Sequence, residues 1–340
     1  MQQYLDTVRN VLTDGHYRRN RTGVDTISTF MQTYEIDLRE GFPLLTTKKM
    51  DGFRWKSLIH ELLWYFSGEE HIRKLREKTG IWNEWADDEG HLETAYGRFW
   101  RRYPVPEESA QLEGEAWAGE DSPFVEEEDG SLVFDQIKYV IDTLKGDNPD
   151  RDPNSRRLVV NAWHPANAGA SLLPPCHYTF VFHVLDGELN VHMTQRSGDI
   201  ALGVPFNIAA YSLIANIIAQ ETGFELGRFG HTIINAHAYA GKGERGEFYR
   251  DNLDELRERV EQVDGGEGFL DVKEWVEDEA PEEEDEGYDH VPGLLEQLSR
   301  EPLSRPRIDI EEKPIDELEF DDINLRDYDS HPGISFEVAE

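Results

Sequence analysis

The segment between residues 206 and 220 constrains the fold of this 340-residue chain most strongly. It predicts a helix that is apolar on nearly every face, and such a helix must be covered on all sides. The fold therefore needs a large core, which the 38% of hydrophobic residues can supply, and wholesale disorder is excluded. Asn207 is a polar residue at the start of this buried helix.

Apolar spacing predicts further helices over residues 1–17, 55–68 and 132–144, the second ending at Gly68. Alternation predicts a strand over 26–38. Strands are also predicted over 157–163, over 178–185, which has the character of a buried strand, and over 189–195, which follows the turn Asp186-Gly187. These elements interleave without repeats and without a regular βαβ rhythm. The pattern favours an α+β fold with a mixed sheet.

Acidic residues gather in two runs. Residues 103–131 hold ten Asp and Glu with no Lys or Arg, and residues 263–290 hold thirteen with one Lys. Blocks of like charge are usually solvated loops or tails, so both runs are predicted as loops. The rest of the chain is still long enough for one large domain.

The net charge of -36 excludes a general binder of nucleic acid or of anionic membranes, because such a surface repels phosphate. Arginine outnumbers lysine by 24 to 10. Abundant acid with little lysine fits a protein that stays soluble in concentrated salt, where screening shortens electrostatic range to about 3 Å at 1 M. The alternative is an acidic protein with regulatory loops.

Targeting and redox features point to the cytoplasm. The N-terminus lacks the apolar stretch of a signal peptide, and no run of 18 apolar residues occurs. A single cysteine allows neither an internal disulfide nor a multi-cysteine metal site. We therefore expect a soluble cytoplasmic protein without a bound metal.

Three local motifs are rejected. The GxGxxG pattern of residues 241–246 follows NAHAYA, which is short and polar where a dinucleotide-binding loop needs a buried strand. The sequence HELLW, residues 60–64, has Trp64 where a zinc helix needs its second histidine. Asn20-Arg21-Thr22 is a glycosylation site only in a secreted protein.

Cys176 lies in LLPPCHYTF, after two prolines that stiffen the entry into a strand. A lone intracellular cysteine is more often a buried small hydrophobe, but the fixed position suits a nucleophile. A thiolate near neutral pH would need a nearby cation.

Arginines occur in three short groups, at residues 21–23 (RTG), 155–157 (SRR) and 195–199 (QRSGD). Arginine forks with neighbouring hydroxyls bind phosphate. Any one group could be a surface salt-bridge partner, but three in so acidic a chain indicate an anionic ligand.

The whole chain, apart from the acidic runs, resembles the thymidylate synthase family. The resemblance rests on the stretches DGHYRRNRTGVDT, EGFPLLTTKK, LIHELLWYFSG, IWNEWAD, YGRFWR, DPNSRRLVVNAWHP, LPPCHYTFVFHV, QRSGDIALGVPFNIAAYSL, HAY, LSREPLSRPRI and YDSHPGI. It implies one α+β domain over residues 1–340, with a large mixed β-sheet flanked by helices and acidic insertions near 103–131 and 241–290. It also implies reductive methylation of dUMP to dTMP by 5,10-methylenetetrahydrofolate, without metal or nicotinamide.

The resemblance assigns a role to each matching position. Cys176 is the expected nucleophile, Glu61 orders water for proton transfer, and Tyr96 lies near the thiol. The residues expected to bind dUMP are Arg21, Arg196 and Ser197 on the phosphate, Arg156 and Arg157 donated by the second subunit of a homodimer, Asn207 on uracil, and His237 and Tyr239 on the ribose. The residues expected around folate are Asp199 on the pterin, with Trp82, Leu173, Gly203, Phe206 and Ala339.

Alternatives remain at the levels of residue and function. Glu61 could be a helix-surface acid, Trp82 plain core and Asn207 a helix cap. The whole protein could be a dCMP hydroxymethylase, for which an Asp in place of Asn207 would argue, or an inactive nucleotide-binding relative. Asn235 stands where the family usually has Asp, and the chain reads EVAE at residues 337–340 where the family ends in an apolar residue.

Overall fold

The computed structural model describes residues 1–340 except 21–22, 93–95, 107–121, 172, 283–286 and 339–340. Its helices are α1 (Gln2–Asp14), α2 (Phe53–Ser67), α3 (Tyr96–Arg101), α5 (Gln136–Lys145), α6 (Pro165–Ala170), α7 (Gly203–Thr222), α8 (Gly243–Glu261), α9 (Gly266–Glu279) and α10 (Val291–Leu298). Its strands are β1 (His16–Arg18), β2 (Val24–Thr29), β3 (Gln32–Asp37), β4 (Tyr103–Pro104), β5 (Val125–Glu128), β6 (Ser131–Phe134), β7 (Val159–Asn161), β8 (His177–Leu185), β9 (Glu188–Gln195), β10 (Gly198–Asp199), β11 (Glu225–Ile233), β12 (Ala236–Lys242), β13 (Arg307–Ile310) and β14 (Ile323–Arg326).

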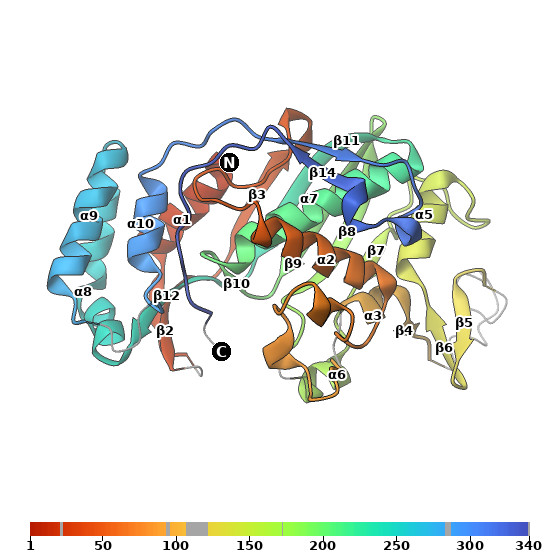
Figure 1. The fold of residues 1–340 in the computed structure, drawn as a ribbon, viewed down its shortest axis with the longest axis horizontal. Coiled ribbons are helices and arrows are strands. Elements are labelled where there is room, and N and C mark those ends of the chain that lie inside the picture. The colour runs from red at the N-terminus through yellow and green to blue at the C-terminus, as the bar shows by residue number, and fades with distance from the viewer. Residues whose placement is uncertain (21–22, 93–95, 107–121, 172, 283–286, 339–340) are drawn as a thin grey trace.

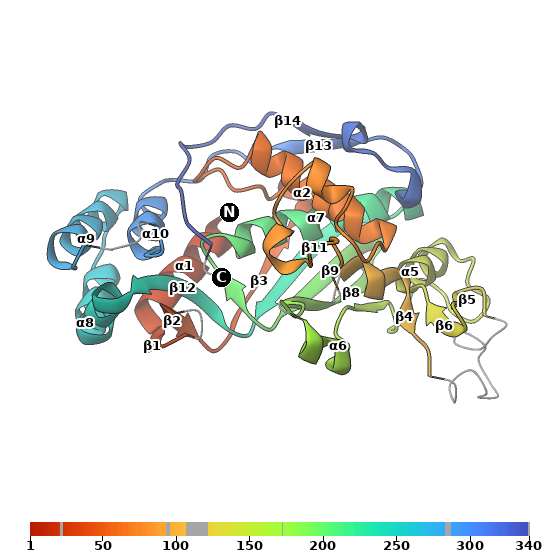
Figure 2. The same cartoon turned by 60° about the horizontal axis from the view of Figure 1, so that its bottom comes forward.

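A five-stranded sheet forms the centre of the molecule, with the strand order β3-β11-β9-β8-β7. The β11–β9 pair is parallel and the other neighbours are antiparallel, so the predicted mixed sheet is confirmed. In Figures 1 and 2, α2 and α7 lie on one side of this sheet. On the opposite face, the side chains of Glu35, His183, His192 and Arg228 are exposed.

Helix α7 has the predicted all-round apolar character. Twelve of its twenty residues are buried, and it packs against β9, β11 and α5. Each large apolar side chain enclosed in this way stabilises the fold by about 1.5–3 kcal/mol. Gly223, in the left-handed conformation at φ 76°, ends the helix. Within the described residues, no helix meets the length and apolarity needed to cross a membrane.

The predicted single strand over residues 26–38 is wrong, because the chain changes sheets within it. β2 belongs to a four-stranded sheet of order β1-β2-β12-β10, whereas β3 is the edge of the central sheet. The break falls at Phe30 and Met31, which are 80% and 49% exposed. Side-chain alternation continues across the break, so periodicity alone could not locate it.

The predicted helix over residues 132–144 also needs correction. Leu132–Phe134 lies in β6, which pairs with β4 and β5, and α5 begins only after Asp135. The Asp135 carboxylate accepts from the Lys138 amide at 2.9 Å, which caps the helix. A short apolar run fits a strand as well as a helix.

The acidic run over residues 263–290 is not a loop along its length, because α9 lies within it. Phe269, Val272 and Val276 are buried at helical spacing, and the acids occupy the remaining faces. The described part of residues 103–131 contains β4, β5 and the start of β6. Sequence analysis overweighted charge and overlooked a sparse helical stripe.

One ion pair and one hydrogen bond attach α8 to the chain that precedes α10. The Arg245 guanidinium lies 2.7 Å from Oδ2 of Asp289, and the Tyr249 hydroxyl donates to the same oxygen at 2.6 Å. Both Arg245 and Tyr249 belong to α8, and both are buried. The pair holds α8 against the chain just before α10.

Helices α2 and α3 meet backbone to backbone. A Cβ on Gly97 would lie 2.0 Å from the Tyr65 carbonyl oxygen, so only glycine allows this approach. The contact places α2, which carries Glu61, beside α3, which carries Tyr96.

Candidate active site

Cys176 lies where a proline-bounded loop enters β8, and it lines a cavity of about 350 Å³. Its backbone N–H donates to the Tyr96 hydroxyl at 2.7 Å. Its Sγ lies 3.9 Å from the Pro174 carbonyl oxygen. The two prolines and Tyr96 therefore fix the thiol at the wall of a pocket, as the sequence predicts.

Arg196 is the cation that sequence analysis could not place beside the thiol. Its backbone N–H donates to the Cys176 carbonyl at 2.9 Å, and its guanidinium donates to the carbonyls of Pro174 and Pro175 at 2.6 and 3.0 Å. Burial raises the pKa of the Cys176 thiol, and the positive charge of Arg196 opposes that rise without cancelling it. The thiol is therefore protonated at neutral pH.

The cavity brings together many of the predicted residues. Those that line it are Leu173, Cys176, Arg196, Ser197, Asp199, His237 and Tyr239. Sequence analysis missed six others, namely Arg18, Arg19, Asn20, Thr26, Trp85 and Asn235. The signal for two of them was available, because Arg18 and Arg19 directly precede the RTG group in the same run of cations. The predicted Arg21 and Ala339 lie outside the described residues.

Glu61 is neither a surface acid nor alone. The Tyr65 hydroxyl donates to its Oε1 at 2.7 Å, and the Trp82 indole N–H donates to the same oxygen at 2.8 Å. Burial raises the pKa of the Glu61 carboxyl, and these two hydrogen bonds oppose the rise. The Trp82 side chain, expected as a wall of a folate site, thus holds the carboxylate.

An aromatic stack joins Glu61 to the Cys176 loop. The Tyr96 and His177 rings are stacked, with centroids 3.9 Å apart, and the Tyr65 ring lies 5.1 Å from the Tyr96 ring. Burial lowers the pKa of His177 to about 3, so its imidazole is neutral. Its Nδ1 pairs with the Tyr211 hydroxyl at 2.7 Å.

Asn207 is not a helix cap. It lies at the start of the second turn of α7, whose N-cap is Leu202. Its Oδ1 accepts from Gln195 Nε2 at 2.9 Å. Within the described residues, its amide nitrogen has no hydrogen-bond partner. Gly203 and Phe206 precede it on the same helix, and Asn207, Gly203 and Phe206 are not among the residues that line the cavity around Cys176.

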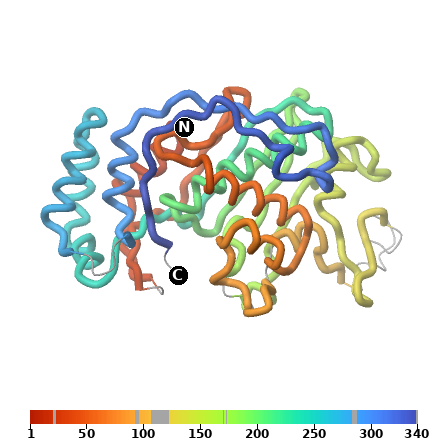
Figure 3. The backbone as a smooth tube through the Cα atoms, in the orientation of Figure 1, coloured from red at the N-terminus to blue at the C-terminus, as the bar shows by residue number. Residues whose placement is uncertain are grey.

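Asp199 is connected to the C-terminal segment through His290. The Nδ1 of His290 lies 3.7 Å from Oδ1 of Asp199, and its Nε2 lies 2.9 Å from the Glu337 carbonyl oxygen. Burial alone would raise the pKa of Asp199, but the charges of His290 and His237 outweigh it and hold that pKa below its usual value. Figure 3 shows the dark blue C-terminal segment running back between α10 and α2.

The buried side chain of Lys48 also contacts the C-terminal segment. Lys48 donates to the Ala201 carbonyl and lies 4.9 Å from the centre of the Phe336 ring. Burial lowers the pKa of Lys48 to about 7. The C-terminal segment therefore covers two titratable groups, His290 and Lys48.

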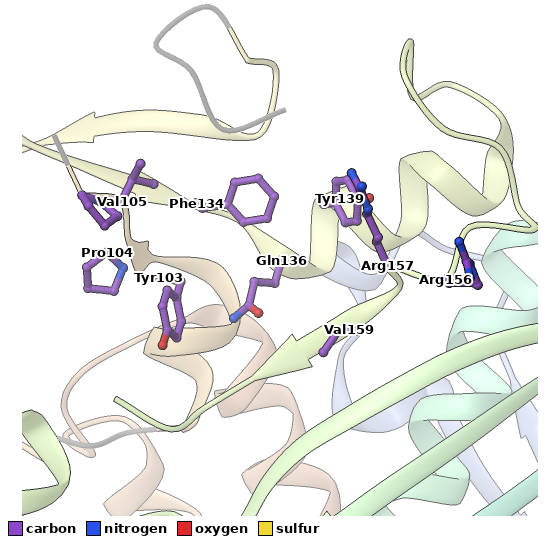
Figure 4. Close-up of a pocket in the computed structure, with 10 residues that line it drawn as sticks. Tyr103, Pro104, Val105, Phe134, Gln136, Tyr139, Arg156, Arg157 and Val159 are labelled. Atoms are coloured by element: carbon purple, nitrogen blue, oxygen red, sulfur yellow. The ribbon is translucent and has the colours of Figure 1, made fainter. Parts of the chain in front are cut away.

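Arg156 and Arg157 do not reach the cavity around Cys176 in their own chain. They line a different cavity of about 460 Å³, together with Tyr103, Phe134 and Tyr139 (Figure 4). They precede β7 at the edge of the central sheet.

Two of the rejected motifs can be checked against the structure, and one reason for rejection was wrong. Residues 236–240 of NAHAYA belong to the largely buried β12, and α8 begins directly after this strand. However, β12 pairs antiparallel with β2 and with only two residues of β10 in parallel, which is not a βαβ unit. His60 stacks on Phe320 with ring centres 4.8 Å apart. The motif Asn20-Arg21-Thr22 lies partly outside the described residues. The described residues include no cluster of three or more His, Cys, Asp or Glu side chains able to hold a metal.

Comparison with known proteins was decisive. A family model described as thymidylate synthase matches residues 2–340. The chain belongs to the thymidylate synthase family. It is 63% identical over 338 residues to the thymidylate synthase of Haloferax volcanii, a match that covers 99% of this chain and 96% of that relative.

Membership in the thymidylate synthase family fixes the reaction. The chain is a methyltransferase that converts dUMP to dTMP, with methylenetetrahydrofolate as co-substrate. The relative comes from a halophilic archaeon, and this supports the salt-adapted interpretation of the acidic surface.

Proposed function

We propose that the cavity around Cys176 is where this thymidylate synthase binds dUMP and methylates it. The observation that carries the proposal is the placement of the only cysteine beside Arg196, in a pocket that also holds Ser197, Asp199, His237 and Tyr239. Arginine and serine side chains suit a phosphate, and the thiol suits covalent catalysis.

In the proposed reaction, the Cys176 sulfur bonds to carbon 6 of uracil and makes carbon 5 an enolate nucleophile. Carbon 5 attacks the folate methylene. Loss of the carbon 5 proton and of tetrahydrofolate leaves an exocyclic methylene, which takes a hydride from the same folate. The sulfur–carbon 6 bond then breaks, which releases dTMP and dihydrofolate.

The protonation state of the thiol follows from two opposing influences. Burial keeps the sulfur protonated despite the positive charge of Arg196. A nucleotide phosphate would bind the arginines of the pocket, including Arg18 and Arg19 on its wall. We propose that Glu61, through ordered water, accepts and returns the protons of the reaction, because its carboxylate is buried and held by two donors.

We propose a homodimer in which Arg156 and Arg157 complete the partner's phosphate site. The face of the central sheet opposite α7 carries exposed side chains, and Val159 and Leu185, at 39% and 57% exposure, are apolar. Arg156 and Arg157 lie at that sheet's edge, away from the Cys176 cavity of their own chain. The two exposed apolar side chains on this otherwise polar sheet face, close to the two arginines, support pairing with a second copy.

Subunit complementation tests the shared site. Cys176→Ser and the double variant Arg156→Ala, Arg157→Ala should each be inactive, and mixing them under exchange conditions should restore about a quarter of the sites. If mixing restores no activity although heterodimers form, the two arginines are not donated to the partner's site.

We further propose that residues 1–340 form one domain and that the protein acts in the cytoplasm. A core of buried side chains drawn from α1, α2, α7 and α10 supports the single domain.

The assay that tests the reaction follows dihydrofolate by absorbance, with dUMP and methylenetetrahydrofolate in molar potassium chloride. Release of tritium from carbon-5-labelled dUMP should accompany it. Turnover of dCMP but not dUMP would favour a hydroxymethylase, and turnover of neither would favour an inactive nucleotide-binding relative.

A further inference from the structure

A chain of four side chains leads from the edge of the central sheet to Asn207. The Tyr34 hydroxyl lies 2.7 Å from Nδ1 of His231, and Nε2 of His231 lies 2.6 Å from Oε1 of Gln195. Nε2 of Gln195 lies 2.9 Å from Oδ1 of Asn207. Tyr34 and His231 face each other across β3 and β11, and Gln195 ends β9.

The hydrogen bonds that link these four side chains can have only one donor-to-acceptor direction. Burial lowers the pKa of His231 to about 3, so the imidazole is neutral and carries one proton. The Gln195 oxygen can only accept, so that proton must be on Nε2. Nδ1 is then an acceptor, and the Tyr34 hydroxyl is its donor.

A second acceptor for the Gln195 side-chain nitrogen fixes the same orientation of the amide. Its nitrogen also donates to the Ser197 carbonyl oxygen at 3.3 Å, and a carbonyl can only accept. With the Gln195 nitrogen facing Asn207, the Asn207 oxygen must be the acceptor. The Asn207 NH₂ is then left for a ligand.

We propose that Tyr34 and His231 are positioning residues that set the base specificity of the enzyme by fixing which way the Asn207 amide faces. The inference rests on the proposed contact between Asn207 and the pyrimidine. An outward NH₂ group suits the carbonyl oxygen of uracil at position 4 and is mismatched with the amino group of cytosine. Tyr34 thus contributes to discrimination without touching the substrate.

Loss of the Tyr34 hydroxyl removes the donor to Nδ1 and frees the His231 proton to move there. Nε2 then becomes an acceptor, which favours the opposite orientation of the Gln195 amide and of Asn207, while the Ser197 carbonyl still favours the original one and limits the size of the effect. The variant Tyr34→Phe should therefore lower the ratio of kcat/KM for dUMP to that for dCMP by about three- to tenfold. His231→Gln, whose amide can face either way, should lower the ratio as well and keeps the test open if Tyr34→Phe folds poorly.

The matched control is Tyr249→Phe. Tyr249 donates to Oδ2 of Asp289 at 2.6 Å and does not line the cavity around Cys176, so the control deletes a buried tyrosine hydroxyl elsewhere in the protein. Its dUMP-to-dCMP ratio should match that of the wild type, and melting curves of all variants at one salt concentration check their folding.

The tautomer of His231 provides a readout independent of catalysis. ¹⁵N-detected spectra of histidine-labelled protein, with the His231 signal assigned from its absence in His231→Gln, should show the proton on Nε2 in the wild type. A proton on Nδ1 in the wild type overturns the inference whatever the activity. An unchanged ratio in Tyr34→Phe also overturns it, while wild-type turnover of dUMP leaves the proposed function standing. If the wild type does not turn over dUMP, the proposed function fails, and the tautomer alone decides the inference.

Discussion

The Tyr65 hydroxyl lies 2.7 Å from Oε1 of Glu61, one helical turn earlier on α2. The Trp82 indole donates to the same oxygen, so Oε2 remains available for water or substrate. Both donors favour the ionised carboxylate against the burial that disfavours it.

The variant Tyr65→Phe removes one of these donors and little else. The Glu61 pKa, already raised by burial, should rise further, and the carboxylate should form only at higher pH. The acid limb of kcat/KM should therefore move up by about one pH unit, with activity on the alkaline side nearly kept. Tyr249→Phe, which deletes a buried hydroxyl away from the cavity, is the control. An acid limb that stays in place would show that Tyr65 does not tune Glu61.

The variant Cys176→Ser should abolish turnover but keep dUMP binding, because arginine–phosphate contacts dominate affinity in the ground state. Residual turnover above about a thousandth of the wild-type rate would refute the nucleophile assignment. Titration calorimetry with dUMP checks the binding.

Chemical modification gives a second test of Cys176, because the chain has no other thiol. Iodoacetamide should inactivate the enzyme with one label per chain, and dUMP should protect it. Since burial raises the thiol pKa, the reaction of the empty enzyme should be slow at pH 7 and accelerate as pH rises beyond the usual cysteine pKa. Inactivation without labelling of Cys176 would contradict the assignment.

The variant Asn207→Asp should shift preference from dUMP toward dCMP. A carboxylate repels the uracil oxygen but accepts from the cytosine amino group, and mispaired buried groups commonly cost about 1–3 kcal/mol. The ratio of kcat/KM for the two nucleotides should move roughly tenfold or more. Asn216→Asp, farther along α7, makes the same chemical change as a control. Equal shifts in both variants would mean that Asn207 does not read the base.

The protein should lose stability when salt is diluted well below molar. A charge of -36 repels itself once the screening length grows from about 3 Å at 1 M to about 10 Å at 0.1 M. Thermal melting across potassium chloride concentrations measures the effect. The exposed acids Asp271, Glu274 and Asp278 of α9, changed together to Asn, Gln and Asn, should weaken that dependence. A melting temperature that ignores salt would refute the halophilic interpretation and leave the enzyme assignment intact.

Several elements were predictable because their signal is local. Helix α7 was predictable from apolar residues on nearly every face. Helix α2 was predictable from the helical spacing of its apolar residues and from Gly68 at its end. The strands β8 and β9 follow from alternation and the Asp186-Gly187 turn. In contrast, the sheet change at Phe30 depends on pairing with distant β12 and β11, which no local pattern encodes.

The candidate site divides in the same way. Cys176 and the arginine groups could be proposed from residue type and spacing. The bond between Trp82 and Glu61 joins residues 21 positions apart, and the Tyr34–His231 pair joins residues 197 positions apart. Such partners are set by how helices and strands pack, so the sequence predicted neither the hydrogen bond from Trp82 to Glu61 nor the pairing of Tyr34 with His231.

The close approach at Gly97 has a consequence for how this enzyme can vary. Glu61 lies on α2 and Tyr96 on α3, and these two helices are in contact through their main-chain atoms. A Cβ at residue 97 would collide with the Tyr65 carbonyl and push the helices apart. The distance between these two helices is therefore set by a contact that substitutions at other interior side chains do not remove. The lack of a side chain at Gly97 thus sets the distance between the helix that carries Glu61 and the helix that carries Tyr96.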